Sequence, residues 1–196
     1  MEPGSDLVAG RRRAMSAPRR WIQPLVSLLG ALLLSGALIA LPLDVERWGR
    51  LGYLGVFVLT LLSSATILIP SAALGAALKF GAAATLNPVL VGLLAGLAAG
   101  VGESTGYLAG RSGAQLAQME QRAGYRQIAA WVRRFGVWPV LALAAVPLPL
   151  IDLAGLAAGA LGMPFWRFLS ACTLGKVVRF VPVALLGAWL RARGWL

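Results

Sequence analysis

The sequence predicts an all-α integral membrane protein that crosses the bilayer several times. Its hydrophobic fraction is 59% and its charged fraction 13%, against about 45–50% and about 25% in soluble domains. The apolar residues lie in long uncharged runs of the length that a membrane-spanning helix needs. Two of these runs contain prolines and are too long for one span but too short for two, at about 20 residues each. We therefore expect two re-entrant helical hairpins, arranged as an inverted repeat.

The distribution of charge indicates which partners and chemistries to expect. The net charge is +11, with arginines clustered in the N-terminal tail, between residues 111 and 134, and at the C-terminus. Such clusters set membrane topology and contact anionic lipid head groups, so we expect lipids and not nucleic acid as partners. With no histidine and one cysteine, Cys172, the common zinc, haem and His-dependent catalytic sites lack their ligands. We expect no enzyme activity, no metal and no cofactor.

The N-terminal region divides into a tail and a first span. Residues 1–20 contain five arginines and are expected to form a basic cytoplasmic tail, which places the N-terminus inside the cell. Residues 21–43 carry no charge and are predicted to form a transmembrane helix. A signal peptide is the alternative, but the apolar run exceeds the usual 7–15 residues of such a signal.

The first half of the membrane domain is predicted over residues 52–110. An uncharged stretch from Gly52 to Leu78 is interrupted at Pro70 and Ser71. Proline lacks a backbone donor and disfavours helix at the preceding residue, which favours a re-entrant hairpin broken at this point. Pro88 then begins a long helix, which we expect to end in the glycine-containing segment 110–113.

This long helix carries a single acid, Glu103, between two stripes of glycine. The first stripe consists of Gly92, Gly96 and Gly100, and the second of Gly102, Gly106 and Gly110. Small residues allow another helix to approach closely, so the side bearing Glu103 is expected to face protein. An ionisable residue within an apolar membrane span is costly, so we interpret Glu103 as part of a functional site. The alternative is a structural acid paired with Arg111.

The connection over residues 111–135 has helical amphipathic spacing. Its apolar positions are Leu116, Met119, Ala123, Ile128, Trp131 and Phe135, and its basic positions are Arg122, Arg126 and Arg133. This pattern favours an interfacial helix on the anionic cytoplasmic leaflet, with the three arginines as lipid-surface contacts. A solvated connecting helix is the alternative.

The second half is predicted over residues 136–190 and resembles the first in plan. A break at Pro147 and Pro149 is followed by Asp152, and Pro164 begins the last apolar run. That run carries Lys176 and Arg179 about three turns after Pro164. Glu103 holds a similar position after Pro88 in the first half. Paired, proline-interrupted segments of this kind are typical of transporters with inverted repeats.

The charged residues in these spans define the candidate pathway. Lys176 and Arg179 are suited to contact a phosphate, with Glu103 and Asp152 as proton carriers or counter-ions. The alternative is a buried ion pair between one of these cations and one of these acids, which fixes the helix register. The full set of candidates for a substrate or proton pathway is Glu103, Tyr107, Arg111, Asp152, Lys176 and Arg179.

Two motifs resemble the DedA family within the VTT (SNARE-associated Golgi protein) superfamily, in its shorter bacterial branch. They are GESTGYLAGRSG at 102–113 and PLPLIDLAGLAAGALGMPFWRF at 147–168, and the resemblance covers about residues 50–190. It implies two opposing re-entrant hairpins and a role in moving phospholipids or polyprenyl phosphates, in some members with proton coupling. By position, Glu103 matches the acid that follows the first hairpin in the family, and Gly110 and Arg111 match its Gly-Arg pair.

The chain departs from the family pattern in both hairpins. Many members carry acids in the first hairpin, where this chain has Ile69, Pro70, Ser71 and Ala72. Many also carry arginines beside the prolines of the second, where this chain has Ala145, Val146 and Leu148. These differences weaken the expectation of proton coupling and of phosphate capture by the usual arginines.

The predicted function is therefore lipid transport in the cell (inner) membrane by a multi-pass protein with a cytoplasmic N-terminus. A proton- or ion-coupled transporter of a small solute is one alternative. A non-transporting factor that organises the membrane through the amphipathic connection is another. The sequence leaves homo-oligomer formation open.

Overall fold

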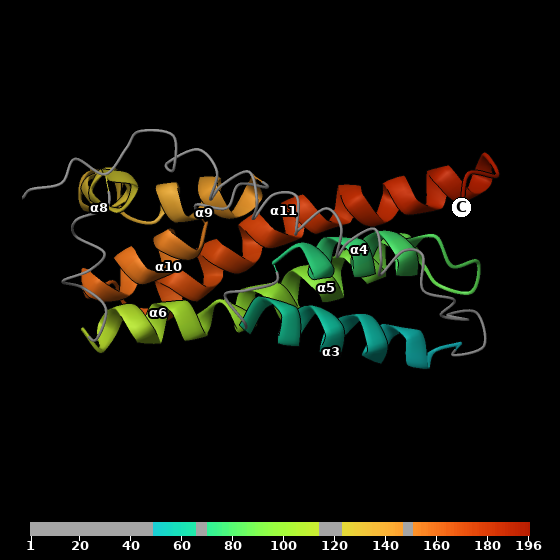
Figure 1. The fold of residues 1–196 in the computed structure, drawn as a ribbon, viewed down its shortest axis with the longest axis horizontal. Helices are drawn as coiled ribbons and strands as arrows, with labels where there is room; N and C mark the ends of the chain where they lie inside the picture. The colour runs from blue at the N-terminus through green and yellow to red at the C-terminus, as the bar shows by residue number, and fades with distance from the viewer. Residues whose placement is uncertain (1–48, 66–69, 114–122, 147–150) are drawn as a thin grey trace, which may run out of the picture. The chain divides into compact units, whose positions relative to one another are not determined.

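The computed structural model describes residues 49–65, 70–113, 123–146 and 151–196 (Figure 1). Within these ranges every regular element is an α-helix, as the sequence predicts. The predicted tail 1–20 and transmembrane helix 21–43 lie outside the described residues. So do the predicted site residues Arg122, Pro147 and Pro149, and the apolar positions Leu116 and Met119.

The first half begins with two short helices, α3 (Leu51–Ala65) and α4 (Pro70–Gly81). They contain 15 and 12 residues, fewer than the roughly 20 that a perpendicular span requires. Pro70 is the first residue of α4 and Ser71 the second. A proline is well tolerated at this position because the first turn of a helix has no acceptor for its N–H.

The third helix of this half, α5 (Pro88–Gly102), has a well-defined start. Asn87 caps it, because its Oδ1 accepts hydrogen bonds from the backbone N–H of Val89 at 2.9 Å and of Leu90 at 3.4 Å. The Asn87 N–H donates to the Tyr53 hydroxyl at 2.9 Å, which ties α3 to the beginning of α5. The predicted helix start at Pro88 is confirmed.

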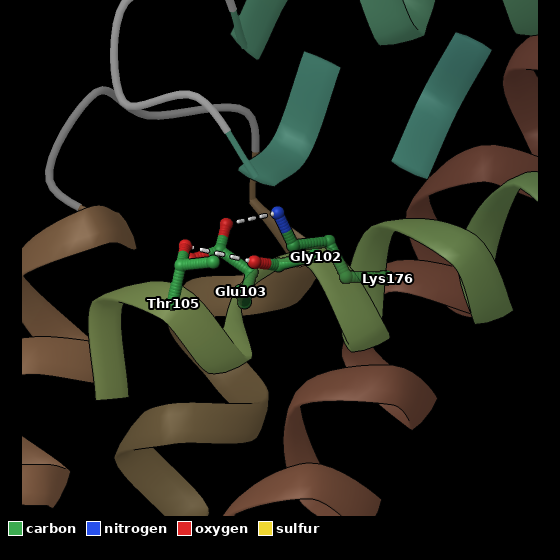
Figure 2. Close-up of polar contacts among 4 residues, drawn as sticks. All are labelled: Gly102, Glu103, Thr105 and Lys176. Carbon is green, nitrogen blue, oxygen red and sulfur yellow. Dashed lines mark hydrogen bonds and ion pairs between the residues drawn. The ribbon is translucent and has the colours of Figure 1, made fainter. Parts of the chain in front are cut away.

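A local irregularity at Glu103 separates α5 from α6 (Ser104–Arg111). The Glu103 N–H still donates to Ala99 O at 3.1 Å, and Glu103 O accepts from Tyr107 N at 3.2 Å, so the helix continues across the break. The Thr105 hydroxyl donates to Gly102 O at 3.0 Å (Figure 2). Threonine hydroxyls compete for backbone carbonyls in this way, which explains a break within the single long helix predicted from the sequence.

The second half contains α8 (Ala123–Phe135), α9 (Trp138–Ala145), α10 (Ile151–Ala160) and α11 (Phe165–Ala192). Again two short helices, of 8 and 10 residues, precede a long one of 28. Helix α11 follows Pro164, as predicted, and continues through Pro182. Helix α8 occupies the last part of the connection in which an amphipathic helix was predicted.

Helix α11 joins the two halves. It packs against α4 and α5 and also against α9, while α10 packs against α6 and α8 (Figure 1). Its N-terminal residues Phe168 and Cys172 belong to one buried apolar cluster with α6, α8, α9 and α10. Its C-terminal residues Phe180 and Ala184 belong to a second cluster with α3, α4 and α5.

The first glycine stripe lies against α11. A Cβ added at Gly92 would lie 2.5 Å from Val181 Cα, and one added at Gly96 would lie 2.6 Å from Val177 Cα. The third member, Gly100, lies against Thr173. Because the partner number falls as the glycine number rises, α5 and α11 run antiparallel. The prediction that this stripe faces protein is confirmed.

Candidate functional site: a buried ion pair between the two halves

The centre of the candidate site is an ion pair between Glu103 and Lys176. The Lys176 ammonium nitrogen lies 2.6 Å from Glu103 Oε1 (Figure 2). Lys176 is 4% exposed and Glu103 6% exposed, so both charges are removed from the surface. The pair connects α11 to the irregularity between α5 and α6, that is, the second half of the chain to the first.

The antiparallel packing explains why these two residues meet. Each Cα–Cβ bond in a helix tilts toward the N-terminus of that helix. In an antiparallel pair, Glu103 leans toward Gly100 and Lys176 leans toward Thr173, and Gly100 and Thr173 lie against each other. The absence of a Cβ at Gly100 brings the helices close enough for the two side chains to form a hydrogen-bonded pair.

Within the described residues, the Lys176 ammonium forms its ion pair and hydrogen bond with Glu103. A lysine ammonium has three N–H donors. Arg179 lies one turn further along α11, is half-buried, and has its guanidinium carbon 5.8 Å from the centre of the Phe180 ring.

Tyr107 and Arg111 form a separate polar contact on α6. The Tyr107 side chain is 1% exposed, and its hydroxyl donates to Met163 O at 2.6 Å. Arg111 Nη1 donates to the same hydroxyl at 3.0 Å. The alternative in which Arg111 pairs with Glu103 is therefore wrong, because the carboxylate pairs with Lys176 and Arg111 lies one turn beyond Tyr107.

The ring of Tyr107 packs between aromatic residues at the beginning of α11. It stacks on Phe168 with centroids 4.9 Å apart and meets Phe165 edge-on at 5.5 Å. Tyr107 thus anchors α6 to the α10–α11 connection, at Met163. This residue was predicted to lie on a substrate or proton pathway, and the structure places it in the apolar core.

The remaining predicted residues divide by location. Asp152 lies in the first turn of α10, but its side chain is outside the described part of the structure. Arg126 and Arg133 are exposed on α8. The structure therefore brings together Glu103 and Lys176 and leaves these two arginines at the surface.

The apolar positions of α8 serve two purposes. Ile128 and Val132 are buried in the cluster shared with α10, together with Tyr125. Trp131 and Phe135 are 44% and 52% exposed. The helix is amphipathic, as predicted, but several of its apolar side chains pack on protein, while Trp131 and Phe135 stay exposed.

Tryptophan and arginine residues occur together at both ends of α11. Trp166, beside Arg167, is 76% exposed near the N-terminus. At the C-terminus Trp189 is 45% exposed, and the guanidinium carbon of Arg193 lies 4.5 Å from its ring centre. At 1.5 Å per residue, Trp166 and Trp189 are about 35 Å apart along the helix, close to the thickness of the hydrocarbon region. Tryptophan at both levels is typical of a membrane span.

Comparison with known proteins decides the family. The VTT domain matches residues 69–189, which is more than half of the chain and includes both Glu103 and Lys176. This chain belongs to the VTT domain family. The resemblance identified from the motifs at 102–113 and 147–168 is confirmed at the level of this superfamily.

The curated relatives of this VTT-domain protein are membrane proteins by name. Vacuole membrane protein KMS2 of Arabidopsis thaliana is 32% identical over 103 residues, covering 44% of this chain and 25% of the relative. Vacuole membrane protein 1 of Homo sapiens is 43% identical over 47 residues, covering 24% and 12%. The match thus spans a quarter or less of each relative. No solved structure matches the chain.

Two of the described helices are long and apolar enough to cross a membrane. They are the continuous segment Pro88–Arg111, of 24 residues, and Phe165–Ala192, of 28 residues. These are the helices that carry Glu103 and Lys176. Together with the family, they indicate a membrane protein, and the buried ion pair joins its two candidate membrane spans.

Proposed function

We propose that this VTT-domain protein moves lipids with phosphate head groups, of the phospholipid or polyprenyl-phosphate type, across the bilayer. The observation that carries the proposal is the buried ion pair between Glu103 and Lys176, which joins the two halves of the domain. Ionisable residues within membrane spans are costly, and they commonly mark substrate or ion pathways.

The depth of the ion pair supports this function. Lys176 lies ten residues after Trp166 and thirteen before Trp189. These separations correspond to about 15 Å and about 20 Å along α11. If the two tryptophans lie at the two interfaces, the ion pair lies near the middle of the bilayer, where a crossing head group most needs polar partners.

The packing of the short helices supports an inverted repeat with re-entrant hairpins. In the first half, Gly81 of α4 lies against Ala184 of α11; in the second, Gly159 of α10 lies against Tyr107 of α6. Gly159 lies 78 positions after Gly81, and Tyr107 lies 77 positions before Ala184, so the second contact repeats the first with the two halves exchanged. The same shift relates the contacts Leu78–Gly187 and Leu156–Gly110.

The contacts between α5 and α11, which we call the α5–α11 seam, also repeat when the two halves are exchanged. A shift of 77 positions converts the contact between Gly96 and Val177 into the contact between Gly100 and Thr173. The local two-fold relation would therefore pass through the α5–α11 seam, next to the ion pair. Transporters with inverted repeats bind their substrates near the bilayer midplane, at the interface between the repeats.

In this mechanism Glu103 is the resting counter-ion of Lys176. A lipid phosphate that reaches the seam exchanges with the carboxylate, and the ammonium passes from one anion to the other without being left unpaired. Arg179, one turn away on the same helix, is the second cation in this proposal that shares the phosphate charge. Movement of a lipid between leaflets makes and breaks no covalent bond, so the proposal requires no catalytic residue, metal or cofactor.

The proposal includes a membrane orientation. The arginines of residues 1–20 place the N-terminus on the cytoplasmic side of the cell (inner) membrane. The pairs α3–α4 and α9–α10 then enter from opposite sides as re-entrant hairpins, since each consists of helices too short to cross.

A dithionite assay on proteoliposomes tests the proposal. Dithionite reduces nitrobenzoxadiazole-labelled phospholipid in the outer leaflet, and a lipid transporter exposes the inner-leaflet label as well. With wild type, we expect dithionite to reduce the label in both leaflets. With the double variant Glu103→Gln/Lys176→Gln, we expect it to reduce only the outer-leaflet label, as in liposomes without protein. This variant removes both charges together and leaves neither unpaired. Arg134→Gln, which removes an exposed charge on α8, is the matched control.

Two results would count against the proposal. If folded wild-type protein does not expose the inner-leaflet label, transport of general phospholipids is rejected. If the double variant moves lipid as fast as wild type, the ion pair does not lie on the transport route. A loss of transport in the double variant supports the proposal only if the Arg134→Gln control retains wild-type transport.

A further inference from the structure

A groove lies between the α8–α9 turn and the α10–α11 connection. It has a volume of about 640 Å³, within the range of small-ligand sites, roughly 300–1,000 Å³. We refer to it as the arginine groove. It is lined by Val132, Arg133, Gly136, Val137, Ala160, Leu161, Gly162, Met163, Pro164 and Arg167.

The charge of the arginine groove is uniformly positive. Arg133 from α8 and Arg167 from α11 are its charged lining residues, and both are exposed. Val137 and Pro164, the N-cap residues of α9 and α11, also line it, and neither cap forms a side-chain hydrogen bond. Helix N-termini carry unsatisfied N–H groups and partial positive charge, which adds to the charge of the two arginines.

The shape of the groove depends on tight turns and on a fixed floor. Gly136 and Gly162 line it with φ of +64° and +69°, and a Cβ at either would meet nothing within 4 Å. The floor residue Met163 is 9% exposed, and its carbonyl accepts the hydrogen bond from Tyr107. The hydrogen bond from Tyr107 ties the backbone of the groove at Met163 to the core.

Exposed tryptophans place the groove at the membrane interface. Trp138 follows Val137 and is 69% exposed, and Trp166 precedes Arg167 and is 76% exposed. Tryptophan side chains of this kind prefer the head-group level of the bilayer. An occupant that satisfies both features has an anionic head and an apolar tail.

We propose that the arginine groove binds the phosphate of an anionic phospholipid, with Arg133 on one side and Arg167 on the other. Guanidinium groups bind phosphate oxygens in bidentate fashion, which selects phosphate over other interfacial groups. The binding itself is independent of transport. A role as the first docking position of the transported lipid depends on the proposed function.

The test is a titration of the full-length protein in neutral detergent, followed by native mass spectrometry. The probes are dioctanoyl phosphatidylglycerol, dioctanoyl phosphatidylcholine and inorganic phosphate. We expect the anionic lipid to bind at least tenfold more tightly than the zwitterionic lipid. Loss of each charged hydrogen-bonding group weakens binding by about tenfold or more, so Arg133→Gln/Arg167→Gln is expected to lose about a hundredfold. Arg134→Gln removes a neighbouring exposed arginine outside the groove and is expected to bind as wild type.

Three outcomes would overturn the proposal. The double variant could bind phosphatidylglycerol as tightly as wild type, or the Arg134→Gln control could lose as much affinity as the double variant. Inorganic phosphate could also displace the lipid at equal concentration, which would indicate a site for free phosphate. Each variant is first checked for an unchanged elution profile and melting temperature, which we expect because both arginines are exposed.

The dithionite assay separates this proposal from the proposed function. Lipid binding by wild type without transport would reject transport and leave the arginine groove as a lipid site. Transport that is unchanged in Arg133→Gln/Arg167→Gln, despite lost binding, would show that the groove is not the first docking position. Slower transport together with weaker binding would support both.

Discussion

Replacing Glu103 by glutamine leaves the Lys176 ammonium buried without its counter-charge. At the observed separation of 2.6 Å, and with an effective dielectric constant of about 20, the Coulomb attraction is about 6 kcal/mol. Desolvation of the two ions offsets most of this attraction, at several kcal/mol per ion. The intact pair therefore contributes little net stability, whereas either charge alone is strongly unfavourable.

The expected cost of Glu103→Gln, or of Lys176→Gln, is about 3–5 kcal/mol. For a chain of 196 residues, each kcal/mol lowers the melting temperature by roughly 2–4 °C, so a decrease of roughly 6–20 °C is expected. The double variant removes both charges and leaves two amides that can hydrogen-bond to each other. Its melting temperature should lie within about 5 °C of wild type.

Thermal unfolding in detergent, followed by tryptophan fluorescence, measures these differences, since the chain has seven tryptophans. Arg126→Gln on α8 removes an exposed charge and serves as the control, with an expected change below about 0.5 kcal/mol. If the decreases of the two single variants simply add in the double variant, the two residues do not interact. That result would refute the ion pair as the link between the halves.

Further predictions concern the packing around the pair. Gly96→Leu places a side chain against Val177 Cα and should cost about 1–3 kcal/mol or more, whereas Leu97→Ala, which shortens an exposed side chain, should change the melting temperature much less. Tyr107→Phe removes the hydroxyl that bonds Met163 O and Arg111 and should cost about 1–3 kcal/mol, measured by the same thermal unfolding. Asn87→Ala removes the N-cap of α5 and should cost about 1 kcal/mol; Asn87→Asp keeps the acceptor and should remain near wild type, and equal losses in both variants would contradict the capping role.

Much of the helical framework could be predicted because it depends on local chemistry. Pro88 and Pro164 precede or begin the two long helices, and Gly113, with φ of +72°, follows the end of α6. The burial of Glu103 was also predictable, since the surrounding glycines indicate a closely packed helix face. The break at Glu103 was missed, although the following Ser104 and Thr105 were a signal for it.

The partner of Glu103 could not be chosen from the sequence. Arg111, Lys176 and Arg179 were all available, and the choice between Lys176 and Arg179 depends on the relative register of two helices. That register is established by the contacts of Gly92, Gly96 and Gly100 with α11. A shift of one turn along the seam would bring a different residue to the carboxylate.

The arginine groove was also beyond sequence reasoning. Arg133 was singled out only as a lipid-surface contact, and Arg167 was not singled out. The adjacent Pro164 and Trp166 indicate a helix start near an interface, but nothing local to Arg167 indicates that α8 lies across from it. That proximity results from the packing of α8 on α10.

The sequence by itself determined that this is a helical membrane protein, where its long helices begin, and which face of α5 is buried. These properties follow from apolar length, from proline and glycine backbone chemistry, and from residues within a few turns of one another. Only the tertiary structure decided that Glu103 pairs with Lys176, that Tyr107 belongs to the core, and that Arg133 and Arg167 share a groove. Each of these depends on the register and contact of helices distant in sequence, which local chemistry does not specify.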